Sequence, residues 1–465
     1  MLDIKGSFKE IFKYRYYFFW IFLFAFTLYI HIGYGYNQDN GVIINGAWNL
    51  INNKILYIDF FEFIPPASFY LIFWLWKIFG VSYFVANLFS IIMLFFASYG
   101  IFRISELIYK NKLNYLLPII FIISSGFWPI INHNAFNAFF MIWACYFIIR
   151  GLNDCKEKNF IIAGLLSGIS TLFLQQKGAI LIISIVSFLI FYSLKEKNKI
   201  YLKWCLSYII FSVLPLFILF LWPIKLIYNN LVYFILFHCL EINYIFPWRL
   251  YVILFILLLY IKVFIREKRI DIWFLIFIQF CLLITTFARA DDQHILIVIF
   301  PLYCLTPLLL KKINCTKFLK FIIYSFITLF LVYIIYTVSI FVTLTHKKII
   351  PKIKPTQNII HKFVEENCSD SEDVYFGPFL PQLYFDNRKI NPTPYDWLIT
   401  NHHTEAQFKE ARQILEKKQP KCAVLYYAIV KKFNYEKNNP VDDYIFKNYK
   451  LIFEESGFMF YKKNN

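Results

Sequence analysis

Long apolar runs constrain this chain more than any other feature. Runs near or above about 18 residues recur between Phe18 and Val342, and an α-helix needs a run of that length to cross the hydrocarbon core of a bilayer. Hydrophobic residues make up 59% of the 465 residues and charged residues only 16%, against roughly 45–50% and about 25% in soluble domains. The sequence therefore predicts a polytopic membrane protein.

The apolar runs and the positions of Lys and Arg predict eleven transmembrane helices. Basic clusters fall in short loops that alternate with loops poor in Lys and Arg, and such clusters stay on the cytoplasmic side. An odd number of spans then leaves the amino terminus in the cytoplasm and the carboxyl terminus outside, with the chain in the cell inner (plasma) membrane. The predicted spans are 18–35, 82–103, 113–130, 134–150, 160–176, 178–194, 204–222, 248–265, 272–287, 294–310 and 321–343.

The formal net charge of +18 is explained by this membrane orientation better than by a polyanionic partner, so no nucleic acid is expected. The nine cysteines form no Cys-x-x-Cys pair, and their spacing indicates neither a metal site nor a disulfide framework. Cys368 and Cys422 could pair outside the membrane. We expect them to be free thiols.

Two outer loops and a polar tail complete the predicted organisation. The first outer loop spans residues 36–82 and contains a short apolar helix, Ala67–Phe79, that would lie in the membrane interface. The second runs from Pro223 to Pro247. The tail, residues 346–465, alternates helical and strand patterns and suffices for a small α/β domain. We predict helices at 356–368 and 405–418, strands at 373–376 and 423–427, and a closing hairpin of 451–455 with 457–461.

Three acids of the first outer loop are candidate functional residues: Asp39, Asp59 and Glu62. Acids near the bilayer boundary cost desolvation free energy, so their presence there indicates function by default. A carboxylate within hydrogen-bond reach of an attacking hydroxyl can take its proton as a general base. We predict Asp39 as this base and Glu62 as a residue that positions a substrate. Asp59 either positions a substrate or caps a helix.

Outer-facing cations are candidates for holding a phosphate, since Arg can grip two phosphate oxygens and Lys supplies a point charge. These are Lys177, in a polar break between two spans, Arg289, Lys225 and Arg249. The alternative for each is a side chain that merely reaches toward the interface.

Polar residues at the same outer turns are candidates for positioning a substrate. They are His133, Asn134, Asp292 and His294, and helix capping is the alternative for Asn134. His238 and Glu241 lie at helical spacing, but two residues are weak evidence for a metal. We predict no metal site and no required cofactor, with a divalent metal left open.

Several features occur here in a characteristic order. A basic amino terminus and a first span precede Asp39, which lies early in a large outer loop. Asp59–Pro66 (Asp-Phe-Phe-Glu-Phe-Ile-Pro-Pro) leads into the interfacial helix, and the outer tail contains Gly377–Phe385, then Arg388 and Tyr395. This order resembles the GT-C class of membrane glycosyltransferases. Within it, the chain is similar to family 39, which includes protein O-mannosyltransferases, and to the lipid A aminoarabinose transferases.

The resemblance implies a lipid-linked monosaccharide donor, an inverting displacement and an active site at the outer face beneath the first loop. It assigns the family's first-loop catalytic acid to Asp39. The family often has Asp-Glu at this position, whereas this chain has Asp39-Asn40. The aminoarabinose transferases have Lys after the second acid of the loop, whereas Phe63 follows Glu62 here. We therefore expect Lys177 and Arg289 to supply the phosphate contact.

These observations predict a mainly α polytopic membrane protein of GT-C type. Residues 1–345 would form the transmembrane domain and residues 346–465 an extracytoplasmic α/β domain. The predicted activity moves a monosaccharide from polyprenyl phosphate to a glycolipid, glycan or protein, as in lipid A or glycan modification of the cell envelope. The alternatives are an oligosaccharide ligase or polymerase, and a small-solute transporter.

Overall fold

The protein is described here from a computed structural model that covers residues 4–32, 38–126, 130–239, 248–287, 289–312, 336 and 355–464. Apart from residue 336, the predicted eleventh span, 321–343, lies outside these described residues, as does Glu241. So does the predicted boundary between the membrane part and the tail.

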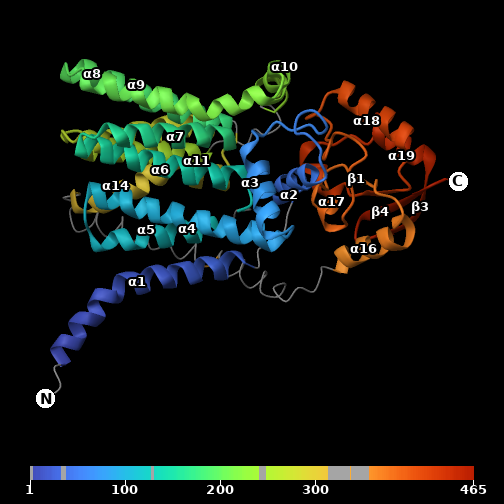
Figure 1. Ribbon diagram of the computed structural model, residues 1–465, viewed down its shortest axis with the longest axis horizontal. Coiled ribbons are helices and arrows are strands. Elements are labelled where there is room, and N and C mark those ends of the chain that lie inside the picture. Colours follow the sequence, from blue (N-terminus) through green and yellow to red (C-terminus); the bar gives the residue numbers. More distant parts are fainter. Residues whose placement is uncertain are drawn as a thin grey trace.

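A layered helical bundle makes up most of the chain (Figure 1). Most of its long helices begin and end within a few residues of the predicted spans, with basic residues at one set of ends, but α1 begins at Ile4, well before the predicted start at residue 18. The predicted spans 204–222 and 294–310 each divide into two helical segments. The helices of the bundle are α1 (Ile4–His31), α4 (Tyr83–Ile108), η1 (Lys112–Tyr115), α5 (Leu116–Ser125), α6 (His133–Asp154), α7 (Glu157–Phe173), α8 (Gln175–Glu196), α9 (Ile200–Val213), η2 (Leu214–Leu221), α11 (Trp248–Phe264), α12 (Ile270–Ile284), α13 (Asp292–Val298) and α14 (Phe300–Lys312).

Four described helical segments are long and apolar enough to cross a membrane, and further apolar helices of the described chain are shorter. The four are α4, α6, α8 and the continuous segment of α9 and η2, Ile200–Leu221. Many large apolar side chains on α9, η2 and α11 are exposed, which fits a surface that faces lipid. The chain is therefore a membrane protein, but this criterion does not establish the predicted number of eleven spans.

Two glycines let α7 and α9 approach each other closely. A Cβ atom on Gly164 or Gly168 would overlap the backbone carbonyl of Tyr208 or Ser212. Small residues four positions apart commonly allow such close packing of membrane helices. This spacing therefore serves helix packing rather than ligand binding.

The first outer loop is more helical than predicted. Residues Gln38–Ile51 form helix α2, where a loop was expected. Residues Ala67–Phe79 form helix α3, with the predicted ends. Ten of the fourteen residues of α2 are buried. The second outer loop is also helical where it is described, with α10 (Ile224–Tyr228) and the π-helical turns η3 (Asn229–Tyr233) and η4 (Ile235–Cys239).

The tail folds around a four-stranded sheet with strand order β1-β2-β4-β3. Strand β1 pairs with β2 in parallel, and the other two pairings are antiparallel. The predicted helices, strands and closing hairpin are confirmed within a few residues. The elements are α16 (Pro355–Cys368), β1 (Tyr375–Gly377), α17 (Gln382–Asp386), α18 (Glu405–Lys418), β2 (Cys422–Leu425), η5 (Ala428–Phe433), α19 (Pro440–Asn448), β3 (Tyr449–Glu455) and β4 (Phe458–Lys463).

Helices α2 and α3 lie between the bundle and the tail (Figure 1). One buried hydrophobic cluster runs from α2 and α3 into the tail. Within it, the rings of Trp76 and Phe385 stack with their centroids 5.0 Å apart, and the indole of Trp48 donates to the carbonyl of Lys389 at 3.0 Å. The tail is therefore packed onto the first outer loop rather than tethered beside it.

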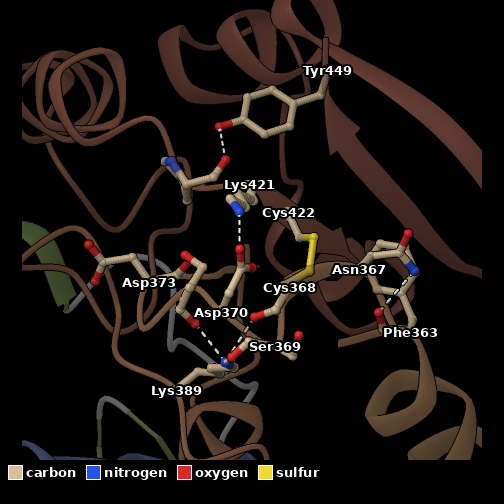
Figure 2. The surroundings of a disulfide bond; sticks show 12 residues. Phe363, Asn367, Cys368, Ser369, Asp370, Asp373, Lys389, Lys421, Cys422 and Tyr449 are labelled. Carbon is tan, nitrogen blue, oxygen red and sulfur yellow. Dashed lines mark hydrogen bonds and ion pairs between the residues drawn. A yellow bond between two sulfur atoms is a disulfide. The ribbon is translucent and has the colours of Figure 1, made fainter. Parts of the chain in front are cut away.

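The expectation of free thiols at Cys368 and Cys422 is wrong, because the two residues form a disulfide (Figure 2). The fold brings the end of α16 beside the start of β2, with the Cα atoms 6.3 Å apart, which is within reach of a disulfide. Nearby, Lys389 donates to the carbonyls of Cys368 at 2.9 Å and of Ser371 at 2.6 Å. The two cysteines are 54 residues apart in the sequence, and this separation does not indicate that they lie together in the fold.

Candidate functional site

Lys177 is the central cation of the candidate site. It lies in the first turn of α8, after the polar break between α7 and α8, and only 2% of it is exposed. Its Nζ donates to Oδ1 of Asn134 at 2.9 Å. Asn134 stands at the start of α6, where the side chain of Asn132 caps the helix by accepting from the N–H of Asn134 at 2.8 Å. The helix cap thus fixes the partner of the buried lysine.

Arg289 lies in the turn that follows α12, beside the start of α13. Its Nε donates to Oδ2 of Asp291 at 2.8 Å, and Nδ1 of His294 lies 2.6 Å from Oδ1 of the same carboxylate. Asp291 also caps α13 by accepting from the N–H of His294 at 3.0 Å. Burial disfavours the charged carboxylate, but its contacts with His294 and Arg289 outweigh burial and hold the pKa of Asp291 below its usual range.

The residues around Lys177 and those around Arg289 influence one another electrostatically. Together we call them the cation cluster: His133, Asn134, Lys177, Arg289, Asp291 and His294. The charges of Asp291 and Arg289 act on Lys177, and those of Lys177 and Arg289 act on His133. The ring of His133 also contacts Asn134, with Nε2 3.0 Å from Nδ2. Five residues predicted separately from the sequence therefore lie together. Among the described side chains, Lys177 and Arg289 both lie near the carboxylate of Asp291, and side chains of these two types are suited to contact a phosphate.

Glu62 is fully buried in the segment between α2 and α3, and its carboxyl oxygens make no hydrogen bond of good geometry in the described chain, although Trp397 lies near them. Burial, with a smaller contribution from the charge of Asp396, raises the pKa of Glu62 well above its usual range. Burial favours the neutral form of a carboxyl group, and this form can both donate and accept hydrogen bonds. Glu62 thus suits the positioning of a substrate better than proton abstraction at neutral pH.

Asp396, from the tail, is the second buried carboxyl near Glu62. Burial raises the pKa of Asp396 as well. Its Oδ2 accepts from Nδ2 of Asn49 on α2 at 2.7 Å, and the charge of Lys54 offsets part of the burial cost. Lys54 in turn donates to the carbonyl of Asn391 at 3.1 Å. Polar groups of the tail and of the first loop therefore meet inside their shared core.

The remaining predicted residues lie elsewhere or are not fully described. Asp39 is exposed in the first turn of α2, and the hydrogen bonds of the described cation cluster do not reach it. Asp59 accepts from the N–H of Ile55 at 2.7 Å, which is a local turn contact. Lys225 is exposed on α10. The structure gives the backbone but not the side chains of Arg249 and Asp292.

Asp291 and Asp396 were not predicted as members of the candidate site. Asp291 stands between Arg289 and His294, so its spacing could have indicated a cap and an ion pair. Asp396 of the tail gave no such signal, because it comes near Glu62 only through the fold. For a metal, the described residues hold no group of three or more His, Cys, Asp or Glu side chains.

The fold is that of the GT-C class of membrane glycosyltransferases. ArnT from Cupriavidus metallidurans, bound to undecaprenyl phosphate, aligns with 95% of this chain and 97% of its own length, with a TM-score of 0.58 and 10% identity. In its apo state, the same protein gives a TM-score of 0.60 with 12% identity over the same fractions. The apo oligosaccharyltransferase of Archaeoglobus fulgidus aligns with 97% of this chain and 75% of its own length, with a TM-score of 0.59 and 11% identity.

Residues 64–222 match the family described as dolichyl-phosphate-mannose-protein mannosyltransferase. No curated protein sequence matches. The family match and the shared fold together indicate an enzyme, a glycosyltransferase of GT-C type, and confirm the resemblance inferred from the sequence. They favour this class over the small-solute transporter.

Proposed function

We propose that this chain is an inverting glycosyltransferase that moves a monosaccharide from a polyprenyl-phosphate donor to an acceptor outside the cytoplasm. The observation that carries the proposal is the cation cluster, in which Lys177 of α8 and Arg289 of the turn after α12 are far apart in the sequence, yet the charge of Arg289 acts on Lys177. A sugar linked through a phosphodiester leaves behind a polyprenyl phosphate that gains negative charge. Cations fixed beside that phosphate stabilise the departing group.

The reaction forms one bond and breaks one. The acceptor hydroxyl oxygen attacks the anomeric carbon from the face opposite the phosphate, the bond from that carbon to the phosphate oxygen breaks, and the hydroxyl proton passes to a carboxylate. We assign this base to Asp39, because it is solvent-exposed at the start of α2, where the helix dipole favours a negative charge. Glu62 positions a substrate. Lys225 and Arg249 are secondary candidates for the phosphate contact.

The donor class is supported by two similarities. ArnT was observed with undecaprenyl phosphate, and the matched family uses dolichyl-phosphate-mannose by its description. Both carriers are polyprenyl phosphates. The lipid tail would remain in the bilayer while the polar head enters the cation cluster, and the amino terminus would be cytoplasmic, in the inner (plasma) membrane. A glycolipid, a glycan and a protein are all candidate acceptors.

Oligosaccharide transfer is the second candidate function. It is favoured by the likeness to the Archaeoglobus fulgidus oligosaccharyltransferase, which has also been observed tethered to an acceptor peptide containing the NVT sequon. Against it stands the burial of Glu62, which has no exposed surface in this structure. A single sugar ring needs less room there than an oligosaccharide.

A donor panel tests the proposal. The detergent-purified chain would be incubated with polyprenyl phosphates that carry one labelled sugar or a labelled oligosaccharide, and with membrane extracts as a source of acceptor. We expect label transfer and release of polyprenyl phosphate from at least one monosaccharide donor. Transfer from oligosaccharide donors alone would favour the second candidate. Turnover of nucleotide sugars but not of lipid-linked sugars would refute both.

A further inference from the structure

An aromatic cluster lies where the first outer loop meets the tail, and we call it the loop–tail cluster: Phe61, Glu62, Phe63, Phe234, Trp397 and His403. The first outer loop and the tail are joined here by the N–H of Phe61, which donates to the carbonyl of Pro394 at 2.7 Å. The rings of Phe63 and Trp397 have centroids 5.7 Å apart, and those of Trp397 and His403 are 4.5 Å apart.

Phe234, which follows η3, completes the cluster from the second outer loop. Its ring centroid lies 5.6 Å from that of Phe63 and 5.7 Å from that of His403. Three segments far apart in the sequence thus contribute rings to one place. Aromatic walls of this kind pack well against the C–H faces of a sugar ring, since both surfaces are apolar.

Four polar atoms of the loop–tail cluster make no hydrogen bond of good geometry within the described chain, although Trp397 lies close enough to the Glu62 carboxyl to oppose the rise in its pKa. They are the two carboxyl oxygens of Glu62, Nε1 of Trp397 and Nε2 of His403. The three residues are 0%, 7% and 7% exposed, respectively. Buried polar groups in native proteins nearly always have a partner. The mixture of donors and acceptors found here matches the hydroxyl groups of a sugar, which can do both.

The loop–tail cluster adjoins the cation cluster. Gln175, two residues before Lys177 on α8, donates from Nε2 to the carbonyl of Phe63 at 3.0 Å. On the tail side, the charge of Arg289 acts on His402, the neighbour of His403. A donor whose phosphate lies at the cation cluster would therefore carry its sugar toward Glu62 and Trp397.

We propose that Trp397 and His403 of the tail form, with Glu62, the subsite for a neutral sugar ring, and so help to determine sugar specificity. This inference rests on the proposed function. The indole N–H of Trp397 donates to one hydroxyl of the sugar. His403 Nε2 and the Glu62 carboxyl form hydrogen bonds with other hydroxyls, and the ring of Phe63 covers a C–H face of the sugar. The buried Glu62 carboxyl, whose pKa is raised by burial and by the charge of Asp396, suits a neutral sugar better than an anionic one. Adjacency to the cation cluster favours the sugar of the donor over a sugar of the acceptor.

Equilibrium binding to the detergent-purified full chain tests this subsite. The probes are polyprenyl phosphate alone, the same carrier with mannose, glucose or galactose, and free methyl mannoside. We expect at least one of these sugars to tighten binding relative to the bare carrier. Trp397→Phe keeps a ring but removes the N–H, and should reduce that gain roughly two- to tenfold while binding of the bare carrier stays unchanged. Trp74→Phe, exposed on α3, is the matched control and should leave the gain intact.

His403→Gln is the second variant, used if Trp397→Phe fails to fold by size-exclusion chromatography, and it should also reduce the gain. Provided that the bare carrier still binds, either of two results would overturn the subsite. One is an unchanged gain in affinity from the sugar in a folded variant, and the other is no gain in affinity from any neutral sugar. If the wild type did not bind the bare carrier, the proposed function itself would be refuted. If methyl mannoside binds alongside the sugar-loaded carrier and is lost in Trp397→Phe, the cluster holds the acceptor's sugar. Competition between methyl mannoside and the sugar-loaded carrier would support the proposal that the cluster holds the sugar of the donor.

Discussion

Lys177 on α8 and Asn134 on α6 are joined by a hydrogen bond of 2.9 Å that is buried on both sides. The amide oxygen holds the ammonium group without neutralising it. Asp291 is the carboxylate whose charge acts on Lys177, and it already contacts Arg289 and His294. A buried cation with so little compensation is costly unless it serves an anion.

Removing either cation should therefore weaken donor binding. We expect Lys177→Gln and Arg289→Gln each to reduce affinity for polyprenyl phosphate about tenfold or more, because a hydrogen bond to a charged group contributes roughly 1.5–3 kcal/mol. Isothermal titration with the purified protein measures this. Lys77→Gln, which changes an exposed lysine of α3, is the control. Normal binding by both variants would move the phosphate site toward Lys225 and Arg249.

The orientation of the chain can be tested by labelling. In a variant whose free cysteines are replaced by Ser, we expect a membrane-impermeant maleimide added outside to modify a cysteine placed at Lys409 and to spare one placed at Lys197. Lys409 is exposed on α18 of the tail, and Lys197 is exposed at the end of α8. Both should react after permeabilisation. The reverse pattern would place the tail in the cytoplasm and contradict the proposed outer active site.

Elements with strong local signals could be predicted from the sequence with their ends. Helix α3 is a run of 13 mostly apolar residues between Pro66 and Gly80, and α18 begins with a capping box formed by Thr404 and Gln407. Such boundaries depend on neighbouring residues alone. The predictions at 67–79 and 405–418 are therefore confirmed residue for residue.

Elements that depend on distant contacts could not be predicted in this way. Helix α2 carries Asn40, Gly41, Asn45 and Gly46, which favour helix only weakly, and burial between the bundle and the tail sustains it. For the same reason, the cation cluster was predicted as separate residues at outer turns. No local pattern indicated that Glu62 faces Trp397.

The disulfide should stabilise the tail. We expect the double variant Cys368→Ser, Cys422→Ser to lose about 2–4 kcal/mol of unfolding free energy, because the cross-link restricts the unfolded chain. Urea unfolding of the purified protein measures the loss. Cys155→Ser, at an exposed free thiol, should change nothing. A reductant should lower the stability of the wild type to that of the double variant, and equal stability without reductant would contradict the pairing.

Asp442 in the tail should make stability depend on pH. Burial raises its pKa to about 6, against an ordinary value of 3.8. Between these values, the folded state holds a proton that the unfolded state has released, so stability falls as the pH rises from about 4 to about 6. The expected loss is of the order of 1–3 kcal/mol.

The variant Asp442→Asn provides the comparison. It keeps an oxygen that can accept from Nδ2 of Asn439 and from the hydroxyl of Tyr435, which lie 2.9 and 3.0 Å from Oδ2 of Asp442. We expect its urea midpoint to vary less across this window than that of the wild type. Parallel curves for the two proteins would show that Asp442 is not the titrating group.

Replacing Asp39 tests the proposed base most directly. We expect Asp39→Asn to fold and to bind polyprenyl phosphate almost normally, because the side chain is exposed at the start of α2 and the amide keeps its shape. The amide cannot accept a proton at neutral pH, so turnover should fall by about 10²–10⁴-fold, the usual contribution of a general base. Single-turnover kinetics with a sugar-loaded carrier separate this loss from any change in binding.

Two matched variants locate the effect of Asp39→Asn. Asp59→Asn alters an acid of the same loop that accepts only a local backbone hydrogen bond among its described contacts, and it should keep nearly normal turnover. Glu62→Gln should be milder than Asp39→Asn, because an amide can replace part of the hydrogen bonding of a neutral carboxyl. Normal turnover by Asp39→Asn would remove it as the base. If Glu62→Gln were then inactive, the proton acceptor would be the buried carboxyl, and donor binding would have to lower its pKa before it could act.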